Sequence, residues 1–427
     1  MSMSTLKVNK LRDTAGSADA ITLDPNGGAV LAGVTTVSTV KVGSGVTISS
    51  DGDVFTTGIT TSSTVIVGSG VTISESGIEA SGIGITCANI NGTQIGGRRN
   101  LVINGAMNVA QRSTSETGLG ASAGYFTLDR FRTTFSNTAG RLTMAQVADV
   151  HDGFANAMKL TCTTADTSIG ASEYFILQHK FEGQDVQQLK KGSSDAEEFT
   201  VSFYVKGNAS ATYVVEMYDL DNNRQISKTF SVTTSWTRVE LTFPADTTGA
   251  LDNDNAASLQ LGIWLHAGSN YTSGTLNSSA FAANTSAQRA GGITSFFDST
   301  DRTFFLTGLQ LEVGSQATPF EHRSYGDELT LCQRYYEICY GGYYGHIPSG
   351  AVGGSIDMVV DFKVTKRTDS TLVEISEEEN CTTSVVVVAS NLSSRKETAH
   401  VRASSIVSGA TGNGKYFFSR FSASAEL

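Results

Sequence analysis

The segment 258–266 carries the side chains best suited to binding chemistry. Its alternate residues are leucine or isoleucine, so the residues between them share the opposite face of a strand. That face would present Gln260, Trp264 and His266, and Tyr271 follows in a loop rich in glycine, serine and asparagine. A sugar can stack its C–H face on an aromatic ring while neighbouring polar groups bond its hydroxyls. These residues therefore form a candidate glycan site, with packing against a loop or a neighbouring subunit as the alternative.

A second candidate is the segment 340–346, YGGYYGH. Glycines between aromatic residues predict a mobile loop that presents Tyr343, Tyr344 and His346. The alternative is aromatic packing at the interface of a trimer.

Other chemistry is not indicated. Residues 219–223 and 252–255 offer oxygen ligands of the kind calcium prefers, but neither has EF-hand spacing, and we interpret both as Asx-rich turns. The five cysteines are scattered and predict free buried thiols. The sequence has no H-E-x-x-H, P-loop or dinucleotide motif. We therefore predict no catalytic residue, no metal ligand and no cofactor.

Composition restricts the partners. The formal net charge of -11 argues against a nucleic-acid backbone and an anionic membrane surface. Residues 1–12 lack the apolar stretch of a signal peptide, and no apolar run is long enough to span a membrane.

Only 17% of the residues are charged, against about 25% in average proteins. A surface rich in serine, threonine and glycine is typical of extracellular or virion proteins. Because such a protein would have to leave the cell without a secretion signal, the composition suggests release by cell lysis.

Strands must position the first candidate site. Apolar and polar residues alternate over 199–206, 237–243 and 258–266, which predicts half-buried antiparallel strands. We expect a β-sandwich or jelly roll of about eight to ten strands over residues 98–322. Trp236 stands at a strand start beside an apolar series, so we expect it in the core.

Residues 21–97 contain a repeat. STVKVGSGVTIS at 38–49 returns as STVIVGSGVTIS at 63–74, with short alternating strands around Gly-Ser-Gly turns. One repeat buries too little apolar surface to offset its ordering entropy. Three chains around one axis would supply the missing contacts, so we predict a repetitive β shaft in a homotrimer; a monomeric solenoid is the alternative. Residues 1–20 lack the repeat and are expected to dock on another protein.

Residues 323–427 form a separate region. Ser324 and Asp327 match a capping box, which predicts one short helix to about residue 338. Alternation over 352–364, 382–388 and 415–421 predicts the strands of a small β-rich tip domain. The expected fold is therefore all-β, with an attachment segment (1–20), a shaft (21–97), a sandwich (98–322) and a tip (323–427).

Two segments carry a resemblance to a known family. NLVINGAMNVAQR at 100–112, followed by DRF at 129–131, resembles the opening of a module common in bacteriophage tail fibres. TGLQLEVG at 307–314, with ATPFEHR at 317–323 and CQRYYE at 332–337, is similar to its closing signature. The shaft repeats resemble tail-fibre proteins of marine cyanobacterial phages.

The resemblance implies a virion fibre whose head is a jelly roll like a carbohydrate-binding module. Its N-terminus would attach to a tail tube, adaptor or nozzle protein, and its partner would be a host surface polysaccharide or lipopolysaccharide. The resemblance carries over no catalytic residue. Two other classes stay open: a structural fibre without a receptor role, and a depolymerase of surface polysaccharide.

Overall fold

The computed structural model describes residues 98–347, 355–379, 382–386, 396–406 and 412–427, together with six short N-terminal strands. The chain divides into two units, Met1–Thr86 and Cys87–Leu427. None of the described helices has both the length and the hydrophobicity needed to span a membrane.

Among its described residues, the N-terminal unit contains two three-stranded antiparallel sheets. One consists of β1 (Lys10–Leu11), β2 (Ile21–Leu23) and β3 (Ala29–Leu31), and the other of β4 (Thr64–Val67), β5 (Val71–Ser74) and β6 (Gly77–Ala80). β4 and β5 are the two strands predicted in the second repeat, and Val65 pairs with Ile73. The strands predicted around residues 40–48 lie outside the described residues, so the shaft as a whole stays a prediction.

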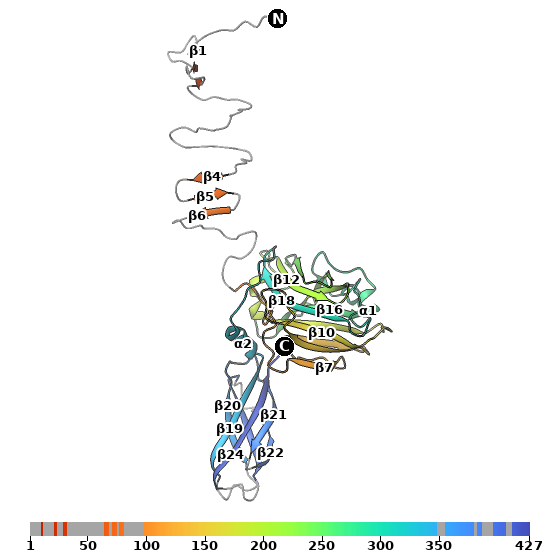
Figure 1. Cartoon of the computed structure of the whole chain (residues 1–427), viewed down its shortest axis with the longest axis vertical. Helices are drawn as coiled ribbons and strands as arrows, with labels where there is room; N and C mark the ends of the chain where they lie inside the picture. Colours follow the sequence, from red (N-terminus) through yellow and green to blue (C-terminus); the bar gives the residue numbers. More distant parts are fainter. Residues whose placement is uncertain are drawn as a thin grey trace. The chain divides into compact units, whose positions relative to one another are not determined.

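Residues 115–313 form a sandwich of two six-stranded antiparallel sheets (Figure 1). The first sheet has the order β15-β12-β18-β10-β9-β7 and the second the order β17-β14-β13-β16-β11-β8. The strands of the first sheet are β7 (Ser115–Leu119), β9 (Arg141–Val147), β10 (Ala157–Thr164), β12 (Phe199–Gly207), β15 (Thr237–Phe243) and β18 (Thr303–Val313). Those of the second are β8 (Arg132–Ser136), β11 (Tyr174–Glu182), β13 (Ala211–Asp219), β14 (Arg224–Val232), β16 (Ala257–Ala267) and β17 (Ala282–Ala283). The predicted sandwich is confirmed, but it has twelve strands instead of the expected eight to ten.

The main core lies between the two sheets, as the alternation predicts. On β12, Phe199, Val201, Phe203 and Val205 point inward and are buried, whereas Tyr204 and Lys206 on the other face are half-buried. The interlocking inner faces of both sheets build one hydrophobic cluster.

The C-terminal region begins with the predicted helix, α2 (Tyr325–Gln333). Ser324 caps it, because its hydroxyl accepts a hydrogen bond of 3.2 Å from the backbone N–H of Asp327. The helix ends before residue 338 because the chain enters β19 (Tyr336–Ile347).

Two three-stranded sheets follow, with the orders β19-β24-β21 and β20-β23-β22. Their other strands are β20 (Ser355–Asp361), β21 (Thr371–Glu379), β22 (Thr382–Val386), β23 (Thr398–Ile406) and β24 (Gly412–Ser424). β20, β22 and β24 overlap the three segments of the tip that were predicted as strands.

The interpretation of residues 340–346 as a loop is wrong, because they belong to β19 and pair with β24. Glycine fits here for a packing reason: a Cβ on Gly341 would lie 2.7 Å from Cγ2 of Val360 on the facing sheet.

The closing signature ties the sandwich to the C-terminal region. Glu182, at the end of β11, is bonded by Arg334 at 2.7 Å and by the Tyr335 hydroxyl at 2.6 Å. The guanidinium of Arg130 stacks on the Tyr335 ring at 3.5 Å and pairs with Glu426 at 2.6 Å. Residues that carry the family resemblance therefore form a buried junction between the sandwich and the C-terminal region.

The predicted Asx turn at 219–223 and the predicted free thiols are present among the described residues. Asp219 accepts a hydrogen bond of 2.9 Å from the backbone of Asn222, so residues 219–223 form the expected Asx turn. Cys162, Cys332 and Cys339 are free and buried; Cys87 and Cys381 lie outside the described residues.

Candidate functional site

The face of β16 that was expected to hold a glycan is inside the protein. Gln260 is 5% exposed, and Trp264 and His266 are 0% exposed. Residues 268–297 fold over this face of the second sheet and form a small second core on it with Trp264 and Ala290. The prediction of an open platform is therefore wrong, and its alternative, packing against a loop, is confirmed.

Polar contacts lock Trp264 in this second core. Its indole N–H donates to the carboxylate of Glu216, 3.0 Å away. Glu216 is fully buried and also receives two hydrogen bonds of 2.6 and 2.7 Å from Arg289 of the covering segment. The Arg289 guanidinium lies over the Trp264 ring at 4.9 Å. Tyr271 is half-buried and packs 5.3 Å from the same ring, so it supports the core instead of extending a platform.

The tip does expose aromatic rings. Tyr340 and Tyr344 are 70% and 71% exposed, Phe418 is 46% exposed, and His346 is exposed as well. They lie on the outer side of the sheet β19-β24-β21, where the rings of Tyr416 and Phe418 are 5.8 Å apart. The side chain of Tyr343 lies outside the described residues.

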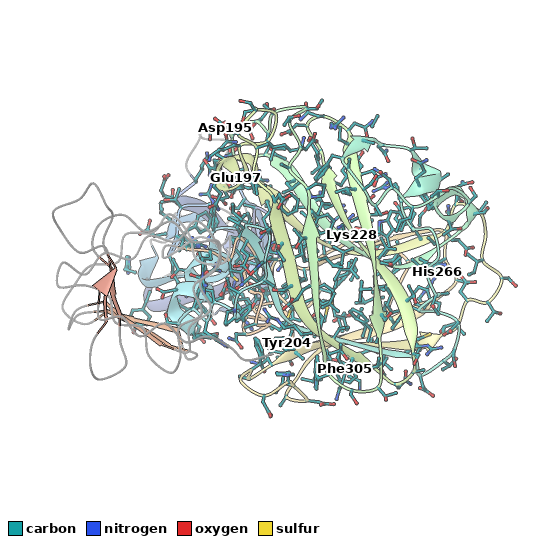
Figure 2. The ribbon with its side chains drawn as sticks, turned by 90° about the horizontal axis from the view of Figure 1, so that it is seen from above. Asp195, Glu197, Tyr204, Lys228, His266 and Phe305 are labelled. Atoms are coloured by element: carbon teal, nitrogen blue, oxygen red, sulfur yellow. The ribbon has the colours of Figure 1, made fainter. Side chains whose placement is uncertain are left out.

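The outer side of the first sandwich sheet carries a site that the sequence analysis missed. We call it the aromatic face and define it by His151, Phe154, Tyr204, Trp236 and Phe305. The His151 and Tyr204 rings are 4.1 Å apart, Phe154 lies 5.5 Å from Tyr204, and Trp236 lies 6.1 Å from Phe305. Four of these side chains are half-buried, and Phe305 is 7% exposed. Figure 2 labels Tyr204 and Phe305 of this face, with His266 away from them.

Cations lie across these rings. The Lys206 ammonium is 5.3 Å from the centre of the Trp236 ring and 4.7 Å from that of Phe305. Asp149 holds the same ammonium at 2.7 and 2.8 Å. Arg238 lies 6.0 Å from the Tyr204 ring. The aromatic face thus combines ring surfaces with charged donors and a carboxylate acceptor.

The closing signature extends this surface. Phe320 and His322 lie 5.1 and 5.2 Å from Phe154, and 4.9 Å from each other. Gly308 makes room for Phe154: its φ is +62°, and a Cβ there would lie 2.6 Å from the Phe154 ring. The pairing of β12 with β18 also shifts register between Ser202 and Tyr204. Gly308 and this irregularity of the sheet therefore lie directly beside Phe154 and Tyr204.

One signal in the sequence pointed to this face. Tyr204 and Lys206 occupy the outward positions of a strand whose inward positions are phenylalanine and valine. The expectation that Trp236 belongs to the core is wrong, because it is half-buried at the outer side of β15. His151 and Phe154 come from the connection between β9 and β10, which has no periodicity to place them.

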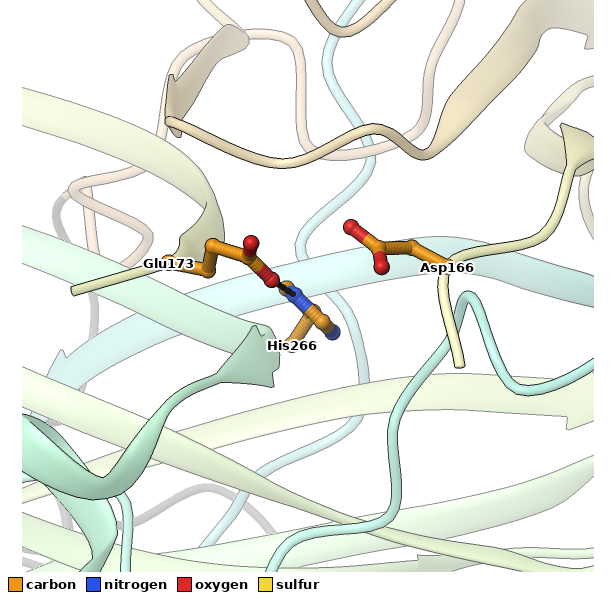
Figure 3. Close-up of side chains that lie close together, drawn as sticks. All are labelled: Asp166, Glu173 and His266. Atoms are coloured by element: carbon orange, nitrogen blue, oxygen red, sulfur yellow. Dashed lines mark ion pairs between the residues drawn. The ribbon is translucent and has the colours of Figure 1, made fainter. Parts of the chain in front are cut away.

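A cluster of ligand-type side chains lies elsewhere, at the end of β16. Asp166 follows β10, Glu173 precedes β11, and His266 belongs to β16; one ligand atom of each lies within 4.8 Å of the others. Figure 3 shows the two carboxylates approaching the imidazole from two sides. Burial lowers the pKa of His266, against the opposing effect of Asp166 and Glu173. Burial raises the pKa of Asp166, but hydrogen bonds from Thr138 and Ala139 outweigh it and the pKa is lowered.

A hollow of about 420 Å³ lies at the junction, lined in part by Arg98, Asp185, Arg334 and Tyr335. Arg334 and Tyr335 are engaged by Glu182. These groups hold the junction together, and no predicted site residue lines the hollow.

No protein-family model and no curated protein matches the sequence. Similar solved structures include a family 4 carbohydrate-binding module, with 12% identity over 49% of this chain and 97% of that one and a TM-score of 0.27. A family 11 module from a Clostridium thermocellum cellulase has 13% identity over 50% of this chain and 99% of that one, with a TM-score of 0.23. The enzymatically active domain of bacteriophage CBA120 tailspike protein 4 has 11% identity over 50% of this chain but 21% of that one, with a TM-score of 0.28. The sandwich is defined by its own strand order and register.

Proposed function

We propose that this chain is a bacteriophage tail-fibre protein that binds a glycan of the host surface through its aromatic face. The observation that carries the proposal is the row of half-buried rings at His151, Phe154, Tyr204 and Trp236, with Lys206 and its partner Asp149 among them. Rings offer stacking surfaces for sugar C–H groups, and the charged side chains offer directional bonds to hydroxyls or to acidic sugar substituents.

The sheet prepares these rings for binding. Tyr204 is fixed on β12, between β15 and β18, and Trp236 directly precedes β15. Side chains that are already ordered lose less conformational entropy when a ligand binds. A row of rings suits an extended saccharide, which contacts several rings in turn.

The rest of the proposal places the chain in a virion. The tail-fibre resemblance of residues 100–131 and 307–337 supports it, and residues 1–20 would attach the fibre to a tail tube, adaptor or nozzle protein. We further propose a homotrimer in which the exposed rings of the tip, Tyr340, Tyr344 and Phe418, pack against other copies. The protein would act by binding and not by cleavage.

Binding of the purified full-length protein to an array of bacterial surface polysaccharides and lipopolysaccharides tests the proposal. We expect retention of a defined set of glycans, and a loss of at least tenfold in affinity for Tyr204→Ala and Lys206→Ala. Tyr325→Ala is the matched control, because Tyr325 is 59% exposed and lies on α2.

Each alternative has its own outcome. A structural fibre without a receptor role retains no glycan, and a depolymerase releases reducing ends from one. If the glycan is bound equally strongly by the Tyr204→Ala and Lys206→Ala variants and by the Tyr325→Ala control, the assignment of binding to the aromatic face is contradicted.

A further inference from the structure

The cluster at the end of β16 brings three side chains of metal-ligand type together. Nε2 of His266 lies 3.5 Å from Oε2 of Glu173, longer than a hydrogen bond. Two ligands of one tetrahedral ion, each bonded at about 2.0 to 2.2 Å, are about 3.4 Å apart. Asp166 completes a set in which all three ligand atoms lie within 4.8 Å of one another.

Two buried polar atoms without hydrogen-bond partners support the presence of a metal ion at this cluster. The His266 side chain is 0% exposed, and apart from their 3.5 Å ion-pair contact with each other, neither its Nε2 nor Oε2 of Glu173 has a hydrogen-bond partner. Burying a polar atom without a partner is costly. The two atoms lie 3.5 Å apart, and an ion between them would satisfy both.

The surroundings hold the three ligands in place. Nδ1 of His266 is 2.8 Å from the Ser295 hydroxyl, which directs Nε2 toward the carboxylates. One oxygen of Asp166 accepts hydrogen bonds from the Thr138 hydroxyl, at 2.7 Å, and the Ala139 backbone, at 2.8 Å. Metal-binding histidines and carboxylates usually have such outer partners.

We propose that Asp166, Glu173 and His266 bind a divalent transition-metal ion of the zinc class. One imidazole with two carboxylates suits zinc and its neighbours, whereas calcium and magnesium prefer oxygen ligands alone. Glu173, whose side chain is 13% exposed, lies at the outer end of the set and gives the ion a way in.

The ion would act as a structural clamp. It would connect the segment between β10 and β11 to the last residues of β16, beside the point where the covering segment 268–297 begins. The backbone N–H of Asp166 already donates to Phe297, and that of Gly268 to Glu173, so the bound ion would reinforce contacts that anchor both ends of this segment. The proposal does not depend on glycan binding.

Titration of the full-length, metal-free protein with Zn²⁺ and Co²⁺ tests the proposal. We expect one equivalent to bind, visible d–d absorption from Co²⁺ in a low-symmetry site, and a higher Tm with either ion. Glu173→Gln and His266→Gln should abolish all three signals. Asp252→Asn is the matched control, because Asp252 is exposed in the acidic turn 252–255, and it should retain them.

Ser295→Ala tests the outer contact. Loss of the hydrogen-bond partner of a metal-binding histidine usually lowers metal affinity by about 10- to 100-fold, so the variant should bind Co²⁺ more weakly with a similar spectrum.

The pattern of metal uptake distinguishes a bound ion at this cluster from a simple ion pair and from an ion bound elsewhere. No uptake by the wild-type chain would overturn the proposal and leave a histidine–carboxylate ion pair, and uptake unchanged in Glu173→Gln would place the ion elsewhere. If His266→Gln does not fold, Glu173→Gln decides alone, because its side chain lies nearest to solvent.

Discussion

The outer sides of the two sandwich sheets make an instructive contrast. Each has one of the two tryptophans of the chain, Trp236 beside the first sheet and Trp264 on the second. Segment 268–297 covers Trp264 and brings Arg289 against its buried partner Glu216. Around Trp236 no comparable segment closes among the described residues, and Lys206 and Phe305 leave it half-buried. An outward aromatic residue on a strand therefore indicates a binding face only if no later part of the chain covers it.

Replacing the two tryptophans should break this contrast most strongly. Trp264→Ala leaves a cavity in the second core and removes the hydrogen bond to Glu216, so we expect a loss of about 3 to 5 kcal/mol in the free energy of unfolding. Trp236→Ala, on the open face, should cost about 1 kcal/mol or less. Urea denaturation followed by circular dichroism measures both. Equal losses would contradict the distinction between a covered and an open face.

The arginines of the two faces give the next largest effect. Arg289→Ala leaves the fully buried carboxylate of Glu216 without its ion-pair partner, and we expect a loss of about 3 kcal/mol, the lower end for a broken buried pair. Arg238 pairs with Glu240 at the surface, so Arg238→Ala should cost about 1 kcal/mol at most. The same denaturation experiment applies, and an Arg238→Ala loss as large as that of Arg289→Ala would contradict the assignment.

The contrast was only partly open to prediction. Alternation located the strands of both sheets and the buried residues between them, because a strand has a fixed period of two. It could not show that residues 268–297, which have no such period, return over β16. It also missed Phe154, whose position depends on the left-handed backbone of Gly308.

The tip and the metal cluster show the same limit. Local rules placed α2 and its cap correctly, but they made a loop of 340–346, where glycine serves the close approach of two sheets. Asp166 and Glu173 lie in one connection, His266 lies far from them in the sequence, and the three form no motif. Only the pairing of β11 with β16 brings two of them together.

The smallest expected effect is on the pH dependence of the unfolding free energy, and it arises from His179 on the inner side of the second sheet. Burial lowers the pKa of His179 well below its ordinary value, and Arg130 and Arg323 lower it further. Below a pH of about 6.5 the unfolded chain therefore binds a proton that the folded protein does not, so stability is lost as the pH falls. Burial raises the pKa of Asp129 to about 6, against the opposing effect of Arg112, and this acts in the opposite sense.

The difference between wild type and His179→Gln isolates the histidine. Between pH 7 and 5 the unfolding free energy of the wild type should fall more steeply than that of the variant. Parallel profiles would show that His179 does not remain neutral in the folded protein.

Fluorescence of the two tryptophans tests the central claim most directly. Trp264→Phe leaves Trp236 as the only tryptophan, and Trp236→Phe leaves only Trp264. We expect the glycan retained most strongly on the array to shift the emission of Trp236 and to protect it from quenching by acrylamide, with no change in the variant that keeps Trp264. A response confined to the variant that keeps Trp264, or none in either while glycan still binds, would contradict binding at the aromatic face.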